Sequence, residues 1–354
     1  MTHVLAVQPV LPPHRYPQAE LAPAIADLIG AQGATRKVLE RIHANCGVGH
    51  RNVALPLEEY AGLTDFGAAN DAFIAAAVDL AAEALTGALA AAGVAPDEVD
   101  LVLSTTITGI AVPSLDALVA ARVGLREDVR RVPIIGLGCA GGAGGLARVH
   151  DYLLGHPRDV AVLLSVELCS LTIQREDTSG ANIVASGLFG DGAGAVVAVG
   201  DEHPAAGGAP GPAVLDSASR LYAGTAGVMG WAIGASGLRI VLGAEVPDLV
   251  RGRVGGDVDA FLAGHGLTRD DVGWWVCHPG GPKVLEALED ALEVEREALG
   301  LTWASLARVG NLSSSSVLHI LADTLAERPP APGSIGMMMA MGPGFGLELV
   351  LLRA

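Results

Sequence analysis

Short apolar runs alternate with helix-like segments along most of this chain, and this alternation restricts the fold more than any other feature. In the first half, the pattern predicts strands at 99–104, 132–137 and 159–166 and helices at 114–123 and 140–154. In the second half, it predicts strands at 272–277, 334–341 and 346–352 and helices at 281–292 and 312–326. Strands that are apolar throughout are typical of sheets covered on both faces. The sequence therefore predicts a layered α/β fold built from two similar halves.

The segment 200–215 is rich in glycine and proline and separates the two halves. We place the boundary at residue 205, which gives an N-terminal half of residues 1–205 and a C-terminal half of residues 206–354. Helix 281–292 has apolar residues at helical spacing and acidic residues elsewhere. Its apolar stripe consists of Val284, Leu285, Leu288, Ala291 and Leu292. This helix is therefore expected to cover a face of the sheet.

The chain is acidic and apolar, and both properties exclude classes of function. It has 354 residues, with 39 Asp and Glu against 22 Lys and Arg, and so a formal net charge of −17. That charge argues against a broad nucleic-acid-binding surface. A content of 51% hydrophobic and 17% charged residues is far from the composition of a disordered chain. No run of 18 consecutive apolar residues predicts a transmembrane segment.

The N-terminus and the cysteines indicate a cytoplasmic protein. Pro9, Pro12 and Pro13 interrupt the region where a signal peptide would have its apolar stretch. The four cysteines are far apart, and no two of them form a CxxC pair. They are expected to be free thiols, and no metal site is predicted.

One of these cysteines lies where a nucleophile would be activated. Residues 136–145 read Gly-Leu-Gly-Cys-Ala-Gly-Gly-Ala-Gly-Gly, so that Cys139 is expected in the first turn of a helix that follows an apolar strand. Unpaired N–H groups and the helix dipole at that position favour the thiolate and predict a lowered pKa for Cys139. The alternative is a small buried cysteine at a tight turn, which the motif alone leaves open.

A histidine and an asparagine occupy comparable positions in the second half. His278 follows the apolar strand 272–277, and Asn311 precedes a serine-rich helix start. Taken alone, His278 would suit a structural role and Asn311 an ordinary N-cap. Because Cys139, His278 and Asn311 all lie at junctions of strands and helices, they can meet at one edge of the sheet. The other histidines are expected on surfaces or in linkers and receive no role, namely His43, His150, His203, His265 and His319.

The chemistry of these three side chains narrows the reaction without fixing it. A thiol beside a histidine is suited to acyl transfer, and a histidine with a carboxamide can stabilise an oxyanion. Hydrolysis and condensation are both open to such a site.

The chain as a whole resembles the type III polyketide synthases, the chalcone-synthase-like branch of the thiolase superfamily. The most specific motifs are Leu-Phe-Gly-Asp-Gly-Ala at 188–193, His-Pro-Gly-Gly-Pro at 278–282, Gly-Asn-Leu-Ser-Ser at 310–314 and Gly-Pro-Gly at 342–344. The resemblance implies a thiolase-like layered αβαβα fold and an acyltransferase that joins acyl-CoA and malonyl-CoA. It implies no metal and no cofactor beyond these CoA thioester substrates. It also implies a homodimer, because Val112 falls where the family inserts a side chain into the partner's cavity; the alternative is a core valine.

The resemblance further implies roles for single residues. Cys139 would carry the starter and the growing chain as a thioester, and His278 would pair with it. His278 and Asn311 would bind the malonyl thioester carbonyl and stabilise the enolate formed on decarboxylation. Phe189 matches the gatekeeping aromatic between the CoA tunnel and the cavity, and a plain core phenylalanine is its alternative. The loop that shapes cyclisation would consist of Gly342, Pro343 and Gly344.

Binding of CoA phosphates by an acidic protein requires a local basic surface. Residues 34–51 contain four Lys and Arg against one Glu, a net charge of +3. Arg41 falls where the family has a CoA-contacting arginine, whereas Val38 and Asn45 replace two family lysines. The side chains that could compensate are Arg36, Lys37 and Lys283. The alternative for all of them is a solvated helix face.

The expected cavity residues favour one branch of the family. Trp231 stands where plant chalcone synthases have a glycine, and Ile240 where they have a gate phenylalanine. The rest of an apolar wall would consist of Ile107, Thr108, Cys169 and Thr172. The segments 166–172, 229–231 and 341–346 look most like bacterial alkylresorcinol and alkylpyrone synthases, which accept long fatty acyl starters. Because each buried methylene contributes about 0.8 kcal/mol, an apolar tunnel would select such chains.

The sequence therefore predicts an enzyme that extends a long-chain acyl starter with malonyl units and closes an alkylresorcinol or alkylpyrone ring. A malonyl-primed naphthalene-type synthase and a ketoacyl synthase III-like initiator of fatty-acid synthesis are the alternatives among condensing enzymes. The motifs at 278–282 and 342–344 favour the polyketide synthases over the initiator. A catalytically silent subunit is disfavoured by the presence of Cys139, His278 and Asn311. A cysteine hydrolase is disfavoured because a tunnel that holds a thioester must exclude water.

Overall fold

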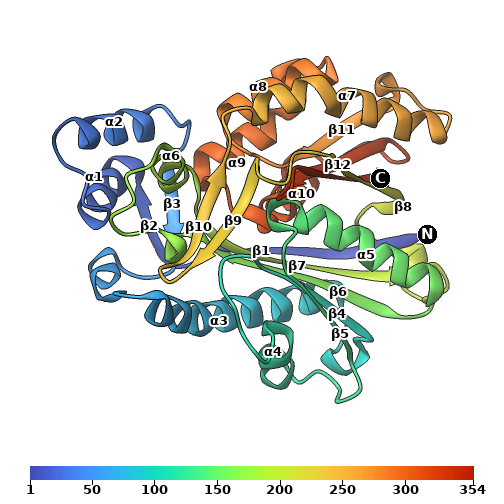
Figure 1. Cartoon of the computed structure of the whole chain (residues 1–354). Helices are drawn as coiled ribbons and strands as arrows, with labels where there is room; N and C mark the ends of the chain where they lie inside the picture. The colour runs from blue at the N-terminus through green and yellow to red at the C-terminus, as the bar shows by residue number, and fades with distance from the viewer.

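A nine-stranded mixed sheet runs through the computed structural model, which describes residues 1–354 (Figure 1). The strands lie in the order β11-β12-β13-β8-β1-β7-β6-β4-β5. They are β1 (Thr2–Val10), β4 (Leu101–Thr105), β5 (Arg130–Ile134), β6 (Val160–Leu168), β7 (Asp191–Gly200), β8 (Ala213–Leu221), β11 (Val272–Cys277), β12 (Ile335–Gly342) and β13 (Gly346–Arg353). Two small sheets pair β2 (His14–Pro17) with β3 (His50–Val53) and β9 (Met229–Gly234) with β10 (Gly237–Leu242). Strand β1 pairs with β7 on one side and β8 on the other, and so joins the two halves into one sheet.

Ten α-helices pack on and between the two halves of the sheet. They are α1 (Gln18–Leu28), α2 (Gly33–Ala44), α3 (Phe66–Ala92), α4 (Leu115–Val123), α5 (Gly141–Gly155), α6 (Gly180–Leu188), α7 (Val246–Gly264), α8 (Pro282–Leu292), α9 (Gly300–Val309) and α10 (Ser316–Glu327). Helices α5 and α10 contact strands of both halves, whereas α3 covers the outer face of the N-terminal half. Helices α7 and α8 cover the C-terminal half on the opposite side of the molecule (Figure 1). This is the expected αβαβα arrangement.

Alternation of side chains along single strands explains how the layers are held together. Along β12, Met337 and Met339 pack in the same apolar cluster as α7 and α8. Met338 and Ala340 pack on the other face, in the cluster that contains α5 and α10. Successive side chains of a strand point to opposite faces, so an apolar run without alternation provides a core for two layers of helices at once.

Helix α3 is the longest helix, and the sequence analysis did not assign it. Its length and apolar composition would allow it to cross a membrane, but one such helix is weak evidence for a membrane span. Half of its most apolar stretch is buried inside the protein. It packs against β1, β6 and β7. A helix that covers a sheet in a layered core has the same apolar composition.

All ten predicted strands and helices are present, but some ends differ. The strand predicted at 132–137 is β5, which ends at Ile134 because its only neighbour, β4, ends opposite it at Thr105. As an edge strand β5 is largely exposed, so its apolar run does not indicate burial on both faces. The helix predicted at 312–326 begins as a 3₁₀ turn at Ser313–Ser315 and continues as α10. The turn between β7 and β8 contains most of the Gly/Pro segment, while the boundary at residue 205 stays a prediction.

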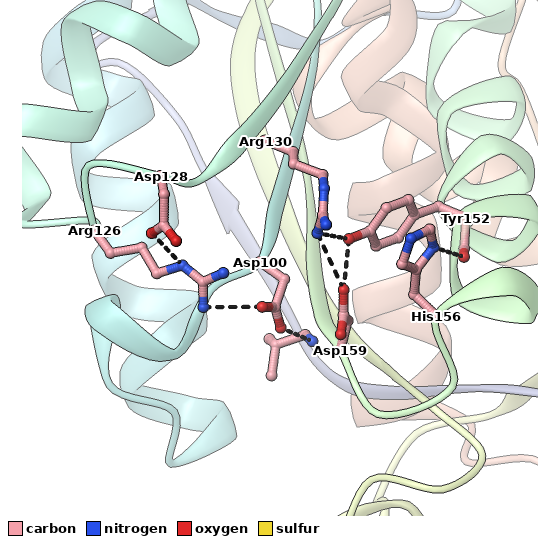
Figure 2. A network of polar contacts seen from close by, with 8 residues as sticks. Asp100, Arg126, Asp128, Arg130, Tyr152, His156 and Asp159 are labelled. Atoms are coloured by element: carbon pink, nitrogen blue, oxygen red, sulfur yellow. Dashed lines mark hydrogen bonds and ion pairs between the residues drawn. The ribbon is translucent and has the colours of Figure 1, made fainter.

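A polar network links the amino-terminal ends of β4, β5 and β6 (Figure 2). Arg130, at the start of β5, donates to the Tyr152 hydroxyl at 2.7 Å, and this hydroxyl donates to Asp159 at 2.6 Å. Arg126 pairs with Asp100 at 2.9 Å. Burial and the bond to Asp159 raise the pKa of Tyr152 to about 12. These contacts hold together the starts of β4, β5 and β6, whose carboxyl ends lead to the site.

Candidate active site

Cys139 lies in a tight turn that leads into α5. The turn is a 3₁₀ helix over Gly138–Ala140, so the cysteine comes just before the α-helix and not in its first turn as predicted. Gly138 has a φ of +50°, which glycine adopts without steric cost. A Cβ at Gly138 would lie 2.6 Å from Cδ of Pro343. The nucleophile turn and the predicted cyclisation loop are therefore in direct contact.

Cys139, His278 and Asn311 come together in one cavity of about 60 Å³. Phe189, Trp231 and Ile240 line the same cavity. Its other predicted members are Ile107, Thr108, Cys169 and Pro343. The lining contains no Lys, Arg, Asp or Glu. The convergence predicted from the sequence is thus present in the structure.

Three predicted residues lie just outside this cavity. Thr172 lines an adjoining cavity, which shares Cys169, Phe189, Trp231 and Ile240 with the first. Gly342 and Gly344 do not line the cavity but flank Pro343, which does. A Cβ at Gly342 would overlap the carbonyl oxygen of Leu137, which explains why the loop can lie so close to the nucleophile turn.

Burial controls the protonation of the reacting pair. Burial raises the pKa of the Cys139 thiol to about 12, although contacts with Ser313 and Asn311 act in the opposite direction. The predicted lowering of the pKa is therefore absent from the resting site, because desolvation of the thiolate outweighs the helix terminus. Burial lowers the pKa of His278 to about 3. At neutral pH both groups are therefore uncharged in the resting site.

Hydrogen bonds hold the backbone at His278 and the side chain of Asn311. His278 follows β11, and its N–H donates to the carbonyl of Met339 at 2.9 Å. Asn311 forms an isolated bridge with Phe189, and its Oδ1 accepts from the N–H of Ser313 at 2.8 Å. With Oδ1 held in this way, the amide Nδ2 is left to donate. Both residues are almost fully buried, so their donors act in a medium of low polarity.

Glu167 is a buried acidic residue beside the site to which the sequence analysis gave no role. One carboxylate oxygen accepts from the Thr108 hydroxyl at 2.9 Å and from the N–H of Ile107 at 3.1 Å. The other accepts from the hydroxyls of Ser313, at 3.2 Å, and Ser314. The Cys139 thiol lies 3.6 Å from the same Ser313 oxygen, so a chain of polar groups runs from Cys139 to Glu167.

Burial and hydrogen bonding act on the pKa of Glu167 in opposite directions. Burial raises its pKa, and the hydrogen bonds from Ser314 and its neighbours work against that shift. The only signal in the sequence was an acidic residue inside the otherwise apolar strand β6.

The predicted basic surface is smaller than the sequence indicated. Arg51 is buried, and its guanidinium donates to the carbonyls of Ser186 and Phe189 at 2.7 and 2.8 Å. Arg36 is paired with Asp27 and Glu40. Of the residues proposed for this surface, Lys37 and Arg41 on α2 and Lys283 on α8 are exposed and have no acidic partner. Gly47, after α2, lies against Pro282 at the start of α8, so these helix ends are neighbours.

Three histidines also differ from expectation. His43, His150 and His319 are buried, whereas the sequence placed them on surfaces or linkers. Burial lowers the pKa of all three, and of His43 and His319 to about 4. None of them lines the cavity at Cys139.

Comparison with known proteins settles the family. The N-terminal domain of the chalcone and stilbene synthases matches residues 1–202, and the C-terminal domain of the same family matches residues 214–354. The chain belongs to the chalcone and stilbene synthase family. As a member of this family it is a type III polyketide synthase, an acyltransferase.

Individual relatives of this polyketide synthase cover nearly its whole length. It is 57% identical over 352 residues to the 1,3,6,8-tetrahydroxynaphthalene synthase of Streptomyces peucetius subsp. caesius, which covers 99% of this chain and 93% of the relative. It is 30% identical over 277 residues to an alpha-pyrone synthesis polyketide synthase-like protein of Mycobacterium tuberculosis, which covers 78% and 70%. The crystal structure of the tetrahydroxynaphthalene synthase of Streptomyces coelicolor A3(2) matches with a TM-score of 0.92 at 26% identity over 99% of each chain. Two of these three relatives are tetrahydroxynaphthalene synthases, and the third is named for alpha-pyrone synthesis.

Proposed function

We propose that this polyketide synthase is primed by malonyl-CoA and makes a tetrahydroxynaphthalene from malonyl units alone. The observation that carries the proposal is the 57% identity to a tetrahydroxynaphthalene synthase across 99% of the chain. The carbon balance fits, because five malonyl groups that each lose one carbon dioxide leave the ten carbons of a naphthalene.

Each residue of the site has a part in this reaction. The Cys139 sulfur attacks the thioester of the first malonyl-CoA, His278 accepts the thiol proton and CoA leaves. His278 and Asn311 hold the thioester carbonyl of the next malonyl-CoA while it loses carbon dioxide. The resulting enolate attacks the thioester on Cys139, a carbon–carbon bond forms and the Cys139 thiolate leaves. The lengthened chain is now a CoA thioester, and it returns to Cys139 with release of CoA before the next extension. Because decarboxylation supplies the carbanion, the proposed reaction needs no metal or redox cofactor.

The cavity supports short building blocks. The large side chains of Phe189 and Trp231 both border the cavity and limit the room for a starter. With no charged residue in the lining, the polar ends of a polyketide find few partners there and bond to one another, which favours folding of the chain into rings.

A long-chain acyl starter is the second candidate, and one observation favours it. The cavity that adjoins the site also contacts Arg51, Ser170 and Ile173, which line a further cavity of about 280 Å³ beside α1. Most residues around that further cavity are apolar. An acyl tail that passed Cys169 and Trp231 could extend in this direction.

The two candidates differ in the products they make. Purified enzyme is incubated with malonyl-CoA alone and with malonyl-CoA plus acyl-CoA starters from acetyl to stearoyl, and the products are identified by mass spectrometry. We expect a tetrahydroxynaphthalene from malonyl-CoA alone and none from the Cys139→Ala variant. If products form only when a long-chain starter is present, the second candidate replaces the proposal.

We also propose a two-fold dimer that forms around Val112. This residue is 93% exposed, which removes the alternative of a core valine. Ile110 and Ile135 are exposed beside it and border the same surface cavity. An apolar patch of this kind is typical of a surface that a second subunit covers. Sedimentation of the enzyme and of a Val112→Asp variant tests the dimer, since a monomeric native enzyme would contradict it.

A further inference from the structure

One buried hydroxyl holds the loop that carries Pro343. Thr225 lies between β8 and β9 and is 6% exposed. Its hydroxyl lies 2.8 Å from the carbonyl oxygen of Gly344 and 2.7 Å from that of Tyr222. The N–H of Gly344 donates to the carbonyl of Met229 at 2.9 Å. Both backbone polar groups of Gly344 are therefore bonded to the segment 222–229.

The backbone held in this way is strained. Gly344 and Phe345 have φ angles of +76° and +48°, so two successive residues adopt left-handed conformations. For a residue with a side chain, such as Phe345, this conformation is unfavourable and persists only where the surroundings fix it. Phe345 is fully buried, and its ring packs on Tyr222 with 5.4 Å between centroids. The loop conformation thus depends on its contacts with the segment 222–229.

The other side of this loop forms a wall of the active site. Pro343 lines the cavity and contacts the nucleophile turn at Gly138. Met229 starts strand β9, and Met229, Gly230 and Trp231 line the same cavity. The segment 222–229 consequently connects two parts of the cavity wall, one at Pro343 and one at Trp231.

We propose that Thr225 is a positioning residue that sets the distance between these two walls and so directs ring closure of the chain held on Cys139. The inference rests on the proposed function, since it concerns the folding of the polyketide in that cavity. A hydroxyl has one hydrogen to donate, so Thr225 shares it between the carbonyls of Tyr222 and Gly344. Valine has nearly the same shape but no hydroxyl, so it leaves the Gly344 carbonyl without this donor.

The test compares Thr225→Val with Thr225→Ser, which keeps the hydroxyl. Each variant and the wild type are given malonyl-CoA alone, and the ratio of two-ring naphthalene to single-ring products is measured by mass spectrometry together with malonyl-CoA consumption. We expect the ratio to fall about fivefold in Thr225→Val, which corresponds to about 1 kcal/mol. In Thr225→Ser the ratio should stay near that of the wild type, and malonyl-CoA consumption should change little in either variant.

Two results would overturn the inference. One is an unchanged product ratio in Thr225→Val. The other is an equal fall of all products in Thr225→Val, which would indicate a structural role only. Thermal unfolding of each variant is measured in parallel, and Thr225→Ala is used if the valine variant does not fold. Tyr222→Phe is the matched control, because it removes a hydroxyl that bonds Asp257 but not the Gly344 carbonyl.

Failure of the proposed function gives a different result. In that case the wild type makes no naphthalene. The positioning role of Thr225 is then tested by comparing the ratio of cyclised to uncyclised products in Thr225→Val with that in the wild type.

Discussion

Replacement of Gly138 by alanine should slow condensation strongly while leaving the protein folded. The added Cβ would lie 2.6 Å from Cδ and 2.8 Å from Cγ of Pro343, whereas ordinary contacts begin near 3.4 Å. Pro343 or the nucleophile turn must therefore move by close to 1 Å. A misplacement of about 1 Å at a reacting group can reduce the rate about 100-fold. The left-handed backbone adds a stability cost of about 1 kcal/mol.

Gly136→Ala is the matched control for this variant. Gly136 also has a positive φ, of +99°, but a Cβ there would meet nothing within 4 Å. Both variants should lose similar stability in urea unfolding, and only Gly138→Ala should lose about 100-fold in kcat for malonyl-CoA consumption. If the kcat values of the two variants agree within about threefold, the contact between Gly138 and Pro343 does not position Cys139 and our reasoning fails.

Three further predictions concern pH, catalysis and CoA binding. Burial lowers the pKa of His319 to about 4, so this histidine takes up a proton below about pH 6.5 in the unfolded protein but not in the folded one. The free energy of unfolding should therefore fall less steeply from pH 6.5 to 4 in His319→Gln than in the wild type. Parallel curves of unfolding free energy against pH would contradict this prediction. Asn311→Ala should slow carbon dioxide release from malonyl-CoA by about 100-fold to 1,000-fold, and an unchanged release rate would exclude Asn311 as the enolate donor. Arg41→Ala should raise the KM for malonyl-CoA without changing kcat. Arg36→Ala should raise the KM less, because Arg36 is already paired with Asp27 and Glu40. Equal increases in KM would contradict the prediction that only an unpaired arginine binds CoA.

The sequence predicted the layers and the meeting of the three candidate catalytic residues because both follow from local patterns. Apolar runs such as that of β12 indicate a strand covered on both faces, and its methionines do pack on both sides. Cys139, His278 and Asn311 each follow a strand or precede a helix, and the topology of the sheet brings these junctions to one edge. Neither conclusion needs knowledge of distant contacts.

Protonation and burial could not be predicted in the same way. The pKa of Cys139 depends on how deeply other segments bury the thiol, and that burial outweighs the helix terminus that the sequence shows. Arg51 resembles its exposed neighbours in sequence, yet it reaches the carbonyls at the end of α6, which lies more than 130 residues away along the chain. Glu167 was visible only as an acidic residue in an apolar strand, because its partners come from other segments of the chain.

We propose that every carbon of the product derives from malonyl-CoA through the thioester on Cys139. Labelling tests it most directly: the enzyme is given uniformly ¹³C-labelled malonyl-CoA together with an equal amount of unlabelled long-chain acyl-CoA, and the mass of each product is measured. We predict a naphthalene in which all carbons are labelled, and no such product from Cys139→Ala. A product that combines labelled ring carbons with an unlabelled alkyl tail would contradict the account.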